Sequence, residues 1–210
     1  MNRADFPPFY AIVDSAAAQT PVELAELLLE GGARILQLRL KNVPSRDFFK
    51  AATEIAQLCH RAGAKLIVND RPDIALLAGA DGVHVGQDDI PLRAARRLLG
   101  VKAIIGVSTH SVEQALAAER EGADYIGFGP MFPGGIKGTV QGQGLERLRE
   151  VRARVSLPIV AIGGIREADV PSVLRAGADS VAIITDVISS ANIPEKVRAI
   201  LAAAASVGRG

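Results

Sequence analysis

The sequence predicts an α/β protein, a single-domain (β/α)8 TIM barrel that spans residues 1–210. Three observations predict this fold. Helix-like and strand-like patterns alternate along the chain, the strand-like runs are built from Ala, Val, Ile and Leu, and a Gly-Ala step recurs between them. Apolar residues make up 49% of the chain but aromatic residues only 4%, which is typical of buried parallel strands. Eight strand-helix units in 210 residues favour a closed barrel over the alternative, an open doubly wound sheet.

Eight apolar runs are expected to form the strands. They cover residues 9–13, 34–40, 66–69, 83–85, 103–107, 125–128, 158–162 and 180–184. Helices are expected at residues 21–30, 44–62, 91–99, 111–120, 144–154, 167–175 and 194–204, with a short helical stretch after Asp70. The first helix shows the reasoning: Thr20 is a capping residue, Pro21 suits the first helical position, and apolar residues follow at helical spacing.

A Gly-Ala joint precedes five of these strands. It occurs at residues 32–34, 63–65, 79–81, 122–124 and 177–179. Gly adopts the left-handed conformation that ends a helix, and Ala is small enough for a tight turn into the sheet. We expect the third residues Asp81, Asp124 and Asp179 to cap turns at the end of the barrel away from the active site.

Charge and cysteine content narrow the classes of function. The chain has 24 basic and 23 acidic residues, so it has no overall field for nucleic acid or membranes and any phosphate binding must be local. The single cysteine, Cys59, cannot form an internal disulfide and is expected to be a small buried group in a reducing cytoplasm. No apolar run reaches about 18 residues and no basic leader is visible, so neither a membrane span nor a signal peptide is expected. The oligomeric state, including a homo-oligomer, stays open.

Polar side chains gather where the expected strands end, which is where active sites of such barrels lie. Gln37, Arg39 and Lys41 are spaced by two and so share one face of a strand. Asn69 and Asp70 follow the third strand, and Asp89 follows the fourth. Basic groups and two carboxylates at one rim match a magnesium-complexed pyrophosphate, so we expect Asp70 and Asp89 to bind Mg²⁺.

The other ends add donors of several kinds. Ser108 follows the fifth strand, and Lys137 stands in a glycine-rich loop after the sixth. Gly164 after the seventh strand, and Ile184 and Thr185 after the eighth, place compact backbone where N–H groups can bind a second phosphate. Two anion sites imply two small-molecule substrates.

Three nearby polar side chains have structural interpretations. His84 lies inside the fourth strand and is expected to be a hydrogen-bonded residue of the barrel interior. His110 stands on the rim, where a solvated or capping role and a ligand role are equally open. Asp88 alternates to the face opposite Asp89 and is expected to face solvent or to cap the next helix.

Several strings, in this order and at these intervals, resemble the thiamine-phosphate synthase family, also called thiamine-phosphate pyrophosphorylase. They are QLRLK, IVNDRPDIALLAGADGVHVGQDD, GVSTHS, GADYIGFGP and IVAIGGI. The resemblance covers almost the whole chain, and the joint occurrence of QLRLK, VND and HVGQDD is its specific part. It implies an Mg²⁺-dependent transferase that joins hydroxymethylpyrimidine pyrophosphate to thiazole phosphate and releases pyrophosphate.

The resemblance also implies roles for individual residues. Gln37 and Ser108 would lie by the pyrimidine, whereas Arg39, Lys41, Asn69 and Lys137 would meet the pyrophosphate, and Asp70 and Asp89 would hold magnesium. Gly164, Ile184 and Thr185 would receive the thiazole phosphate. Arg39, Lys41, Ser108 and Lys137 would be the catalytic residues.

The sixth loop departs from the family. Residues 133–137 read Pro-Gly-Gly-Ile-Lys where the family usually has a Thr-x-Thr-Lys run, so two hydroxyl donors are absent. Two alternatives therefore stay open: a thiazole tautomerase-like isomerase and a non-catalytic barrel that binds thiazole phosphate.

Overall fold

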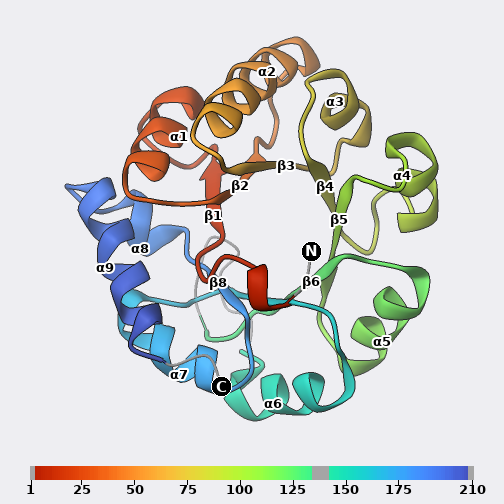
Figure 1. The fold of residues 1–210 in the computed structure, drawn as a ribbon, viewed down its shortest axis with the longest axis vertical. Coiled ribbons are helices and arrows are strands. Elements are labelled where there is room, and N and C mark those ends of the chain that lie inside the picture. Colours follow the sequence, from red (N-terminus) through yellow and green to blue (C-terminus); the bar gives the residue numbers. More distant parts are fainter. Residues whose placement is uncertain (1–2, 134–141, 208–210) are drawn as a thin grey trace.

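The structure, a computed structural model, describes residues 3–133 and 142–207. Eight parallel strands form one sheet in chain order, and helices surround it as an outer ring (Figure 1). The strands are β1 (Ala11–Asp14), β2 (Ile35–Arg39), β3 (Lys65–Asn69), β4 (Gly82–Val85), β5 (Ile104–Thr109), β6 (Tyr125–Phe128), β7 (Ile159–Ile162) and β8 (Ser180–Ala182). The predicted (β/α)8 barrel is confirmed.

The described helices follow the predicted order with small shifts at their ends. They are α1 (Pro21–Glu30), α2 (Ser45–Arg61), α3 (Pro72–Leu77), α4 (Leu92–Leu99), α5 (Val112–Glu121), α6 (Gly144–Arg154), α7 (Val170–Arg175), α8 (Thr185–Ile188) and α9 (Ile193–Ala205), with the 3-10 helices η1 (Arg3–Asp5) and η2 (Glu167–Asp169). Thr20 caps α1 in a capping box with Glu23, as its sequence predicts. No helix in the described ranges is long and apolar enough to cross a bilayer.

The barrel closes between β8 and the residues that precede β1. Phe9 pairs with Val181 in an isolated parallel bridge. The Tyr10 N–H donates to the Val181 carbonyl at 2.9 Å, and the Val181 N–H donates to the Pro8 carbonyl at 3.0 Å. The backbone groups at this seam are therefore satisfied as in a continuous sheet.

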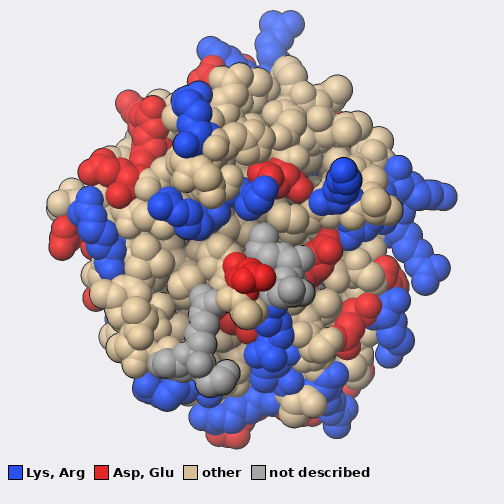
Figure 2. All heavy atoms as spheres, viewed as in Figure 1, with Lys and Arg blue, Asp and Glu red and all other residues tan. Residues whose placement is uncertain are grey.

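The interior of the barrel is filled from the end where the strands begin. Phe6, directly after η1, is fully buried, and its ring centroid lies 5.4 Å from that of Tyr125. In Figure 1 the short red helix η1 lies between the labels of β8 and β6, at the lower side of the ring of strands. Figure 2 shows acidic and basic side chains interspersed over this face, in keeping with the near-zero net charge. With this end plugged, a ligand has access from the carboxyl ends of the strands.

The three predicted joint aspartates bind the neighbouring strand. Asp81 accepts the N–H of Leu66 at 2.9 Å, Asp124 that of Ile105 at 2.7 Å, and Asp179 that of Ile159 at 2.9 Å. Each also pairs with a basic side chain, namely Lys65, Arg96 and Arg152 respectively. Their predicted place at the end of the barrel away from the active site is confirmed. Their hydrogen bonds fix the position at which a neighbouring strand begins.

The chain after β8 differs from the prediction. The apolar run predicts a strand through Ile184, but β8 ends at Ala182 and the short helix α8 starts at Thr185. The Ile184 carbonyl accepts the N–H groups of Val187 and Ile188, both at 3.0 Å. The two isoleucines after β8 are apolar because Ile183 is buried in the core and Ile184 lines a cavity, and not because they continue the strand.

Candidate active site

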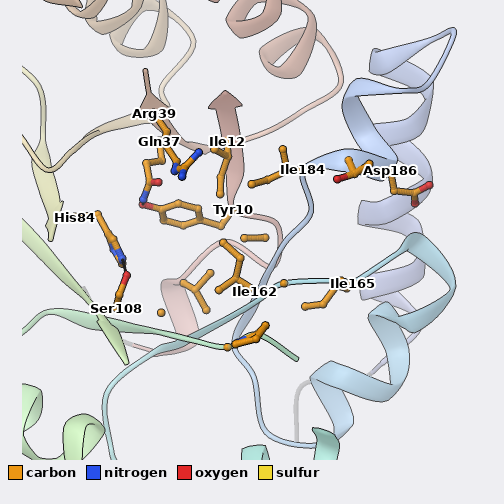
Figure 3. Close-up of a pocket in the computed structure, with 18 of the residues that line it drawn as sticks. Tyr10, Ile12, Gln37, Arg39, His84, Ser108, Ile162, Ile165, Ile184 and Asp186 are labelled. Atoms are coloured by element: carbon orange, nitrogen blue, oxygen red, sulfur yellow. Dashed lines mark hydrogen bonds between the residues drawn. The ribbon is translucent and has the colours of Figure 1, made fainter. Parts of the chain in front are cut away.

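A cavity of about 1000 Å³ opens at the carboxyl ends of the strands. Its two walls differ in character: polar side chains from β2, β4 and β5 face isoleucines from β7 and the chain after β8 (Figure 3). Seven of the predicted substrate-binding residues line it, namely Gln37, Arg39, Asn69, Ser108, Gly164, Ile184 and Thr185. Such a cavity suits a ligand with one polar and one apolar part.

Arg39 is held on the polar wall by a buried carboxylate. Its Nη1 donates to Asp14 Oδ2 at 2.6 Å, and the Asp14 side chain is only 2% exposed. Asp14 Oδ1 also accepts the N–H of Ala16 at 2.9 Å, which fixes the carboxylate in turn. A guanidinium has five donors, so Arg39 keeps donors for an anion while its direction is set from behind.

Three further charges lie beside this wall, just past the ends of β2, β3 and β4. Lys41, which follows β2, forms an ion pair with Asp70. Asp70 is one of two described non-glycine residues in the left-handed region, with φ 63°. The Asp89 carboxylate accepts the N–H of Gly86 at 2.7 Å. Burial and then the neighbouring Asp70 carboxyl raise the pKa of Asp89, so the structure brings these two carboxyl groups together.

The paired carboxyl groups fit a magnesium ion by their chemistry. Carboxylate oxygens are hard ligands, and Mg²⁺ is usually bound by one or two carboxylates with water and substrate phosphates completing its shell. Asp70 and Asp89 supply two, and the described residues contain no cluster of three or more acidic, His or Cys side chains. Asp88 is exposed, in keeping with its expected position facing solvent.

A buried hydrogen-bonded chain forms the floor of the polar wall. It joins Gln37 Nε2 to Tyr10 Oη at 3.2 Å, Tyr10 Oη to Tyr125 Oη at 2.6 Å, and Tyr125 Oη to His84 Nδ1 at 2.9 Å. His84 Nε2 then meets Ser108 Oγ at 2.8 Å. Burial lowers the pKa of His84 to about 4 and raises the pKa of both tyrosines. The predicted interior role of His84 is confirmed, and its ring is neutral at pH 7.

The opposite wall carries the glycines that follow β7. A Cβ on Gly164, whose φ is +70°, would lie 2.6 Å from the Phe132 carbonyl oxygen, so a larger residue does not fit. Asp186 of α8 accepts the N–H of Glu167 at 2.9 Å and pairs with Lys196 at 3.3 Å. These contacts tie the chain after β7 to the start of α8, where Thr185 lies.

Two rim residues complete the site. His110 Nδ1 bonds the Gly129 carbonyl at 2.7 Å, and Gln143 Nε2 donates to the His110 carbonyl at 2.9 Å. The ring of His110 thus has a structural partner, and the residue also lines the cavity. Lys137, the remaining predicted catalytic residue, lies outside the described residues.

Comparison with known proteins decides the family. The model of the thiamine monophosphate synthase family matches residues 9–187. The chain belongs to this family. A thiamine-phosphate synthase of Methanocella arvoryzae is 48% identical over 192 residues, which are 90% of this chain and 91% of that protein. One of Methanoculleus marisnigri is 45% identical over 206 residues, which are 95% and 98% of the two chains.

Solved structures agree with this membership. The thiamine phosphate pyrophosphorylase from Pyrococcus furiosus superposes with a TM-score of 0.88 at 35% identity and covers 95% of this chain and 96% of that one. The sequence did not predict three residues of the site in this member of the thiamine monophosphate synthase family, namely Asp14, Tyr10 and Tyr125. Asp14 directly follows the first predicted strand, so its position at the rim was a usable signal. The tyrosines stand within apolar runs and carried no such signal.

Proposed function

We propose that the chain is a thiamine-phosphate synthase that transfers the hydroxymethylpyrimidine group from its pyrophosphate to thiazole phosphate and releases pyrophosphate. The observation that carries this proposal is the arc of charges Asp14, Arg39, Lys41, Asp70 and Asp89 beside the polar wall. Membership of the thiamine monophosphate synthase family supports it. A pyrophosphate leaving group needs this mixture of fixed cations and metal-binding carboxylates.

The residues of the chain act mainly by positioning and by electrostatics. The electron-rich pyrimidine ring stabilises a benzylic-type cation as the pyrophosphate leaves, so the protein must neutralise the leaving group and hold the thiazole nitrogen in line. Arg39 and Lys41 supply positive charge and N–H donors, and Asn69 adds an amide at the cavity wall. Gln37 and Ser108 orient the pyrimidine, and Lys137 is proposed to join them from the sixth loop.

Magnesium is part of the proposal, with Asp70 and Asp89 as the residues that would hold it. The bound ion would supply positive charge for the phosphate oxygens of the leaving group. Lys41 already pairs with Asp70 and so keeps a cation beside the two carboxylates. Asp89 is fixed by the Gly86 N–H.

The thiazole phosphate is proposed to lie along the apolar wall. Ile162, Ile165 and Ile184 offer apolar contact for the ring (Figure 3). Gly164 and the start of α8 at Thr185 place backbone N–H groups for the phosphate, the position such barrels commonly use. The two substrates would then meet in the middle of the cavity.

The isomerase and the non-catalytic binding barrel are weaker candidates. An isomerase that acts on the thiazole phosphate alone has no need for paired carboxylates and two cations on the opposite wall. The proposal also places the enzyme in the cytoplasm, which fits a single cysteine that is unpaired and buried.

The test is product formation from the two substrates with Mg²⁺, followed by chromatography of thiamine phosphate. The proposal expects thiamine phosphate and pyrophosphate in equal amounts. Binding of thiazole phosphate without binding of pyrimidine pyrophosphate, both measured by calorimetry, would contradict it. Isomerisation of the thiazole phosphate would then separate the isomerase from the binding barrel.

A further inference from the structure

The buried hydrogen-bonded chain from Gln37 to Ser108 has a donor-to-acceptor direction, which follows from the number of protons that each group carries. Its four links measure 3.2, 2.6, 2.9 and 2.8 Å. Each tyrosine and the serine has one hydroxyl proton, and a neutral imidazole has one N–H proton. In each hydrogen bond one of the two groups therefore donates and the other accepts. The direction of one bond restricts the direction of the next.

The first link fixes the direction of the following two. Gln37 Nε2 is an amide nitrogen that donates and cannot accept. The Tyr10 proton must then go to Tyr125 Oη, because a buried hydroxyl without an acceptor costs about 1–3 kcal/mol. The Tyr125 proton in turn goes to His84 Nδ1, which lies 2.9 Å from this hydroxyl. The reverse direction would aim the Tyr10 proton at an amide NH₂ group.

The last link follows from the histidine. Because Nδ1 accepts from Tyr125, the neutral ring carries its proton on Nε2 and donates it to Ser108 Oγ. The Ser108 proton is then free, and Ser108 lines the cavity. We propose that Tyr125 and His84 are positioning residues that set Ser108 as a hydrogen-bond donor toward the ligand.

The direction of the hydrogen-bonded chain determines which pattern of donors and acceptors on a substrate ring the polar wall can bind. This step rests on the proposed function. Gln37 lines the cavity too, and its Oε1 accepts no hydrogen bond within the described part of the chain. An acceptor at Gln37 and a donor at Ser108 match an exocyclic amine beside a ring nitrogen, the edge that an aminopyrimidine presents. If the hydrogen bonds ran in the opposite direction, Ser108 would donate its proton to His84 Nε2. Only the lone pairs of its oxygen would then face the cavity, and they would repel the lone pair of a ring nitrogen.

The tautomer of His84 tests the direction without any substrate. Long-range proton–nitrogen NMR spectra of ¹⁵N-histidine-labelled, ligand-free protein at pH 7 report which ring nitrogen carries the proton. The chain has three histidines, so His60→Gln and His110→Gln variants assign the signals. The proposal expects His84 with a proton on Nε2 and none on Nδ1. A proton on Nδ1, alone or on both nitrogens, overturns it.

Two tyrosine variants distinguish the effect of the hydrogen bond from Tyr125 to His84 from the effect of removing any buried phenol hydroxyl. Tyr125→Phe removes the donor to Nδ1, so part of the His84 population is expected to move its proton to Nδ1. Tyr10→Phe is the matched control, because it removes a phenol hydroxyl of equal burial one link further away and leaves Tyr125 donating. It is expected to keep the tautomer of the unmodified protein. If Tyr125→Phe also keeps that tautomer in a folded protein, Tyr125 does not set it.

A substrate analogue tests the pairing with the ring. Tyr125→Phe is expected to lower kcat/KM about 10-fold for the pyrimidine pyrophosphate, the equivalent of one hydrogen bond. With an analogue whose ring nitrogen is replaced by C–H, the same variant is expected to lose nothing further. An equal loss on both substrates overturns the role assigned to Ser108. Absence of thiamine phosphate with the unmodified protein counts against the proposed function alone, because the tautomer is measured without substrate.

Discussion

At the scale of single residues, the site depends on charges whose positions are fixed by other charges. Arg39 lies at the cavity wall because the buried carboxylate of Asp14 holds its Nη1 at 2.6 Å. A charge-assisted hydrogen bond of this kind contributes roughly 1.5–3 kcal/mol. The same pair therefore stabilises the fold and sets the direction in which Arg39 presents its other donors.

Asp14→Asn tests this link. The amide keeps the shape of the side chain but loses the charge, so Arg39 becomes less well oriented and the KM for the pyrimidine pyrophosphate is expected to rise about 10-fold. Steady-state kinetics with each substrate varied in turn measure the effect. Asp47→Asn, on the exposed side of α2, is the control. An unchanged KM in a folded Asp14→Asn protein would show that Arg39 needs no such support.

Asp89 and Asp88 offer a matched pair for the proposed metal site. Asp89→Asn retains an oxygen that accepts the Gly86 N–H, so the loop is expected to keep its shape while the site loses a charged ligand. Turnover with Mg²⁺ should fall by roughly 100-fold or more. Asp88→Asn changes an exposed neighbour and should leave turnover unaltered.

The metal itself is measured apart from activity. Calorimetric titration of Mg²⁺ in the presence of inorganic pyrophosphate should show weaker binding for Asp89→Asn than for Asp88→Asn. Equal affinity in the two variants would remove Asp89 from the set of ligands.

At the scale of elements, the joints before the strands are a repeated device. Asp124 joins the start of β6 to β5, since its Oδ2 accepts the Ile105 N–H at 2.7 Å and the Arg96 Nη2 at 2.6 Å. Asp124→Ala leaves a buried backbone N–H without its partner. The free energy of unfolding is expected to fall by about 1–3 kcal/mol, with kcat unchanged because the joint lies at the far end of the barrel.

Urea denaturation measures this loss of stability. Glu121→Ala, at the exposed end of α5, is the control and should change the unfolding free energy by less than about 0.5 kcal/mol. A loss as large in the control, or a fall in kcat for Asp124→Ala, would contradict the assignment of Asp124 to strand register.

The elements that could be predicted from sequence are those with a strong local signal. The helix α1 begins and ends as predicted, because Thr20, Pro21 and the double glycine at 31–32 mark both ends. The helix α8 was not predicted, because one turn that starts in an apolar run has no period to detect. Ile184 belongs to a strand by composition and to a cavity wall by structure.

At the scale of the whole molecule, the rim of the site and the interior place of His84 were predictable, and the pairing of the two tyrosines in the floor was not. Parallel strands in one barrel end at the same face, so Gln37, Arg39, Asn69 and Ser108 could be placed together from their positions in the sequence. Tyr10 directly precedes β1 and Tyr125 starts β6. They meet only because these two strands face each other across the barrel interior, 115 residues apart in sequence. No local pattern encodes such a contact.

The same buried groups control how the stability of the whole protein depends on pH. The pKa of His84 falls from 6.5 to about 4 on burial, so between these values the unfolded chain binds a proton that the folded chain does not. Stability should therefore decrease as the pH falls from about 6.5 to 4, by up to about 1.4 kcal/mol per pH unit. In His84→Gln this part of the decrease should disappear.

The decrease in stability at alkaline pH should be steeper than the decrease at acid pH, because three buried groups contribute to it in the same direction. Burial raises the pKa of Cys59 to about 12 and also raises the pKa of Tyr10 and Tyr125. Above about pH 9 to 10 the unfolded chain releases these protons while the folded chain keeps them, so stability decreases as the pH rises. Urea midpoints from pH 4 to 11 test both limbs. Cys59→Ala should flatten the curve between pH 9 and 10, and an alkaline limb no steeper than the acid one would mean that the phenols in the barrel interior ionise as readily as in water.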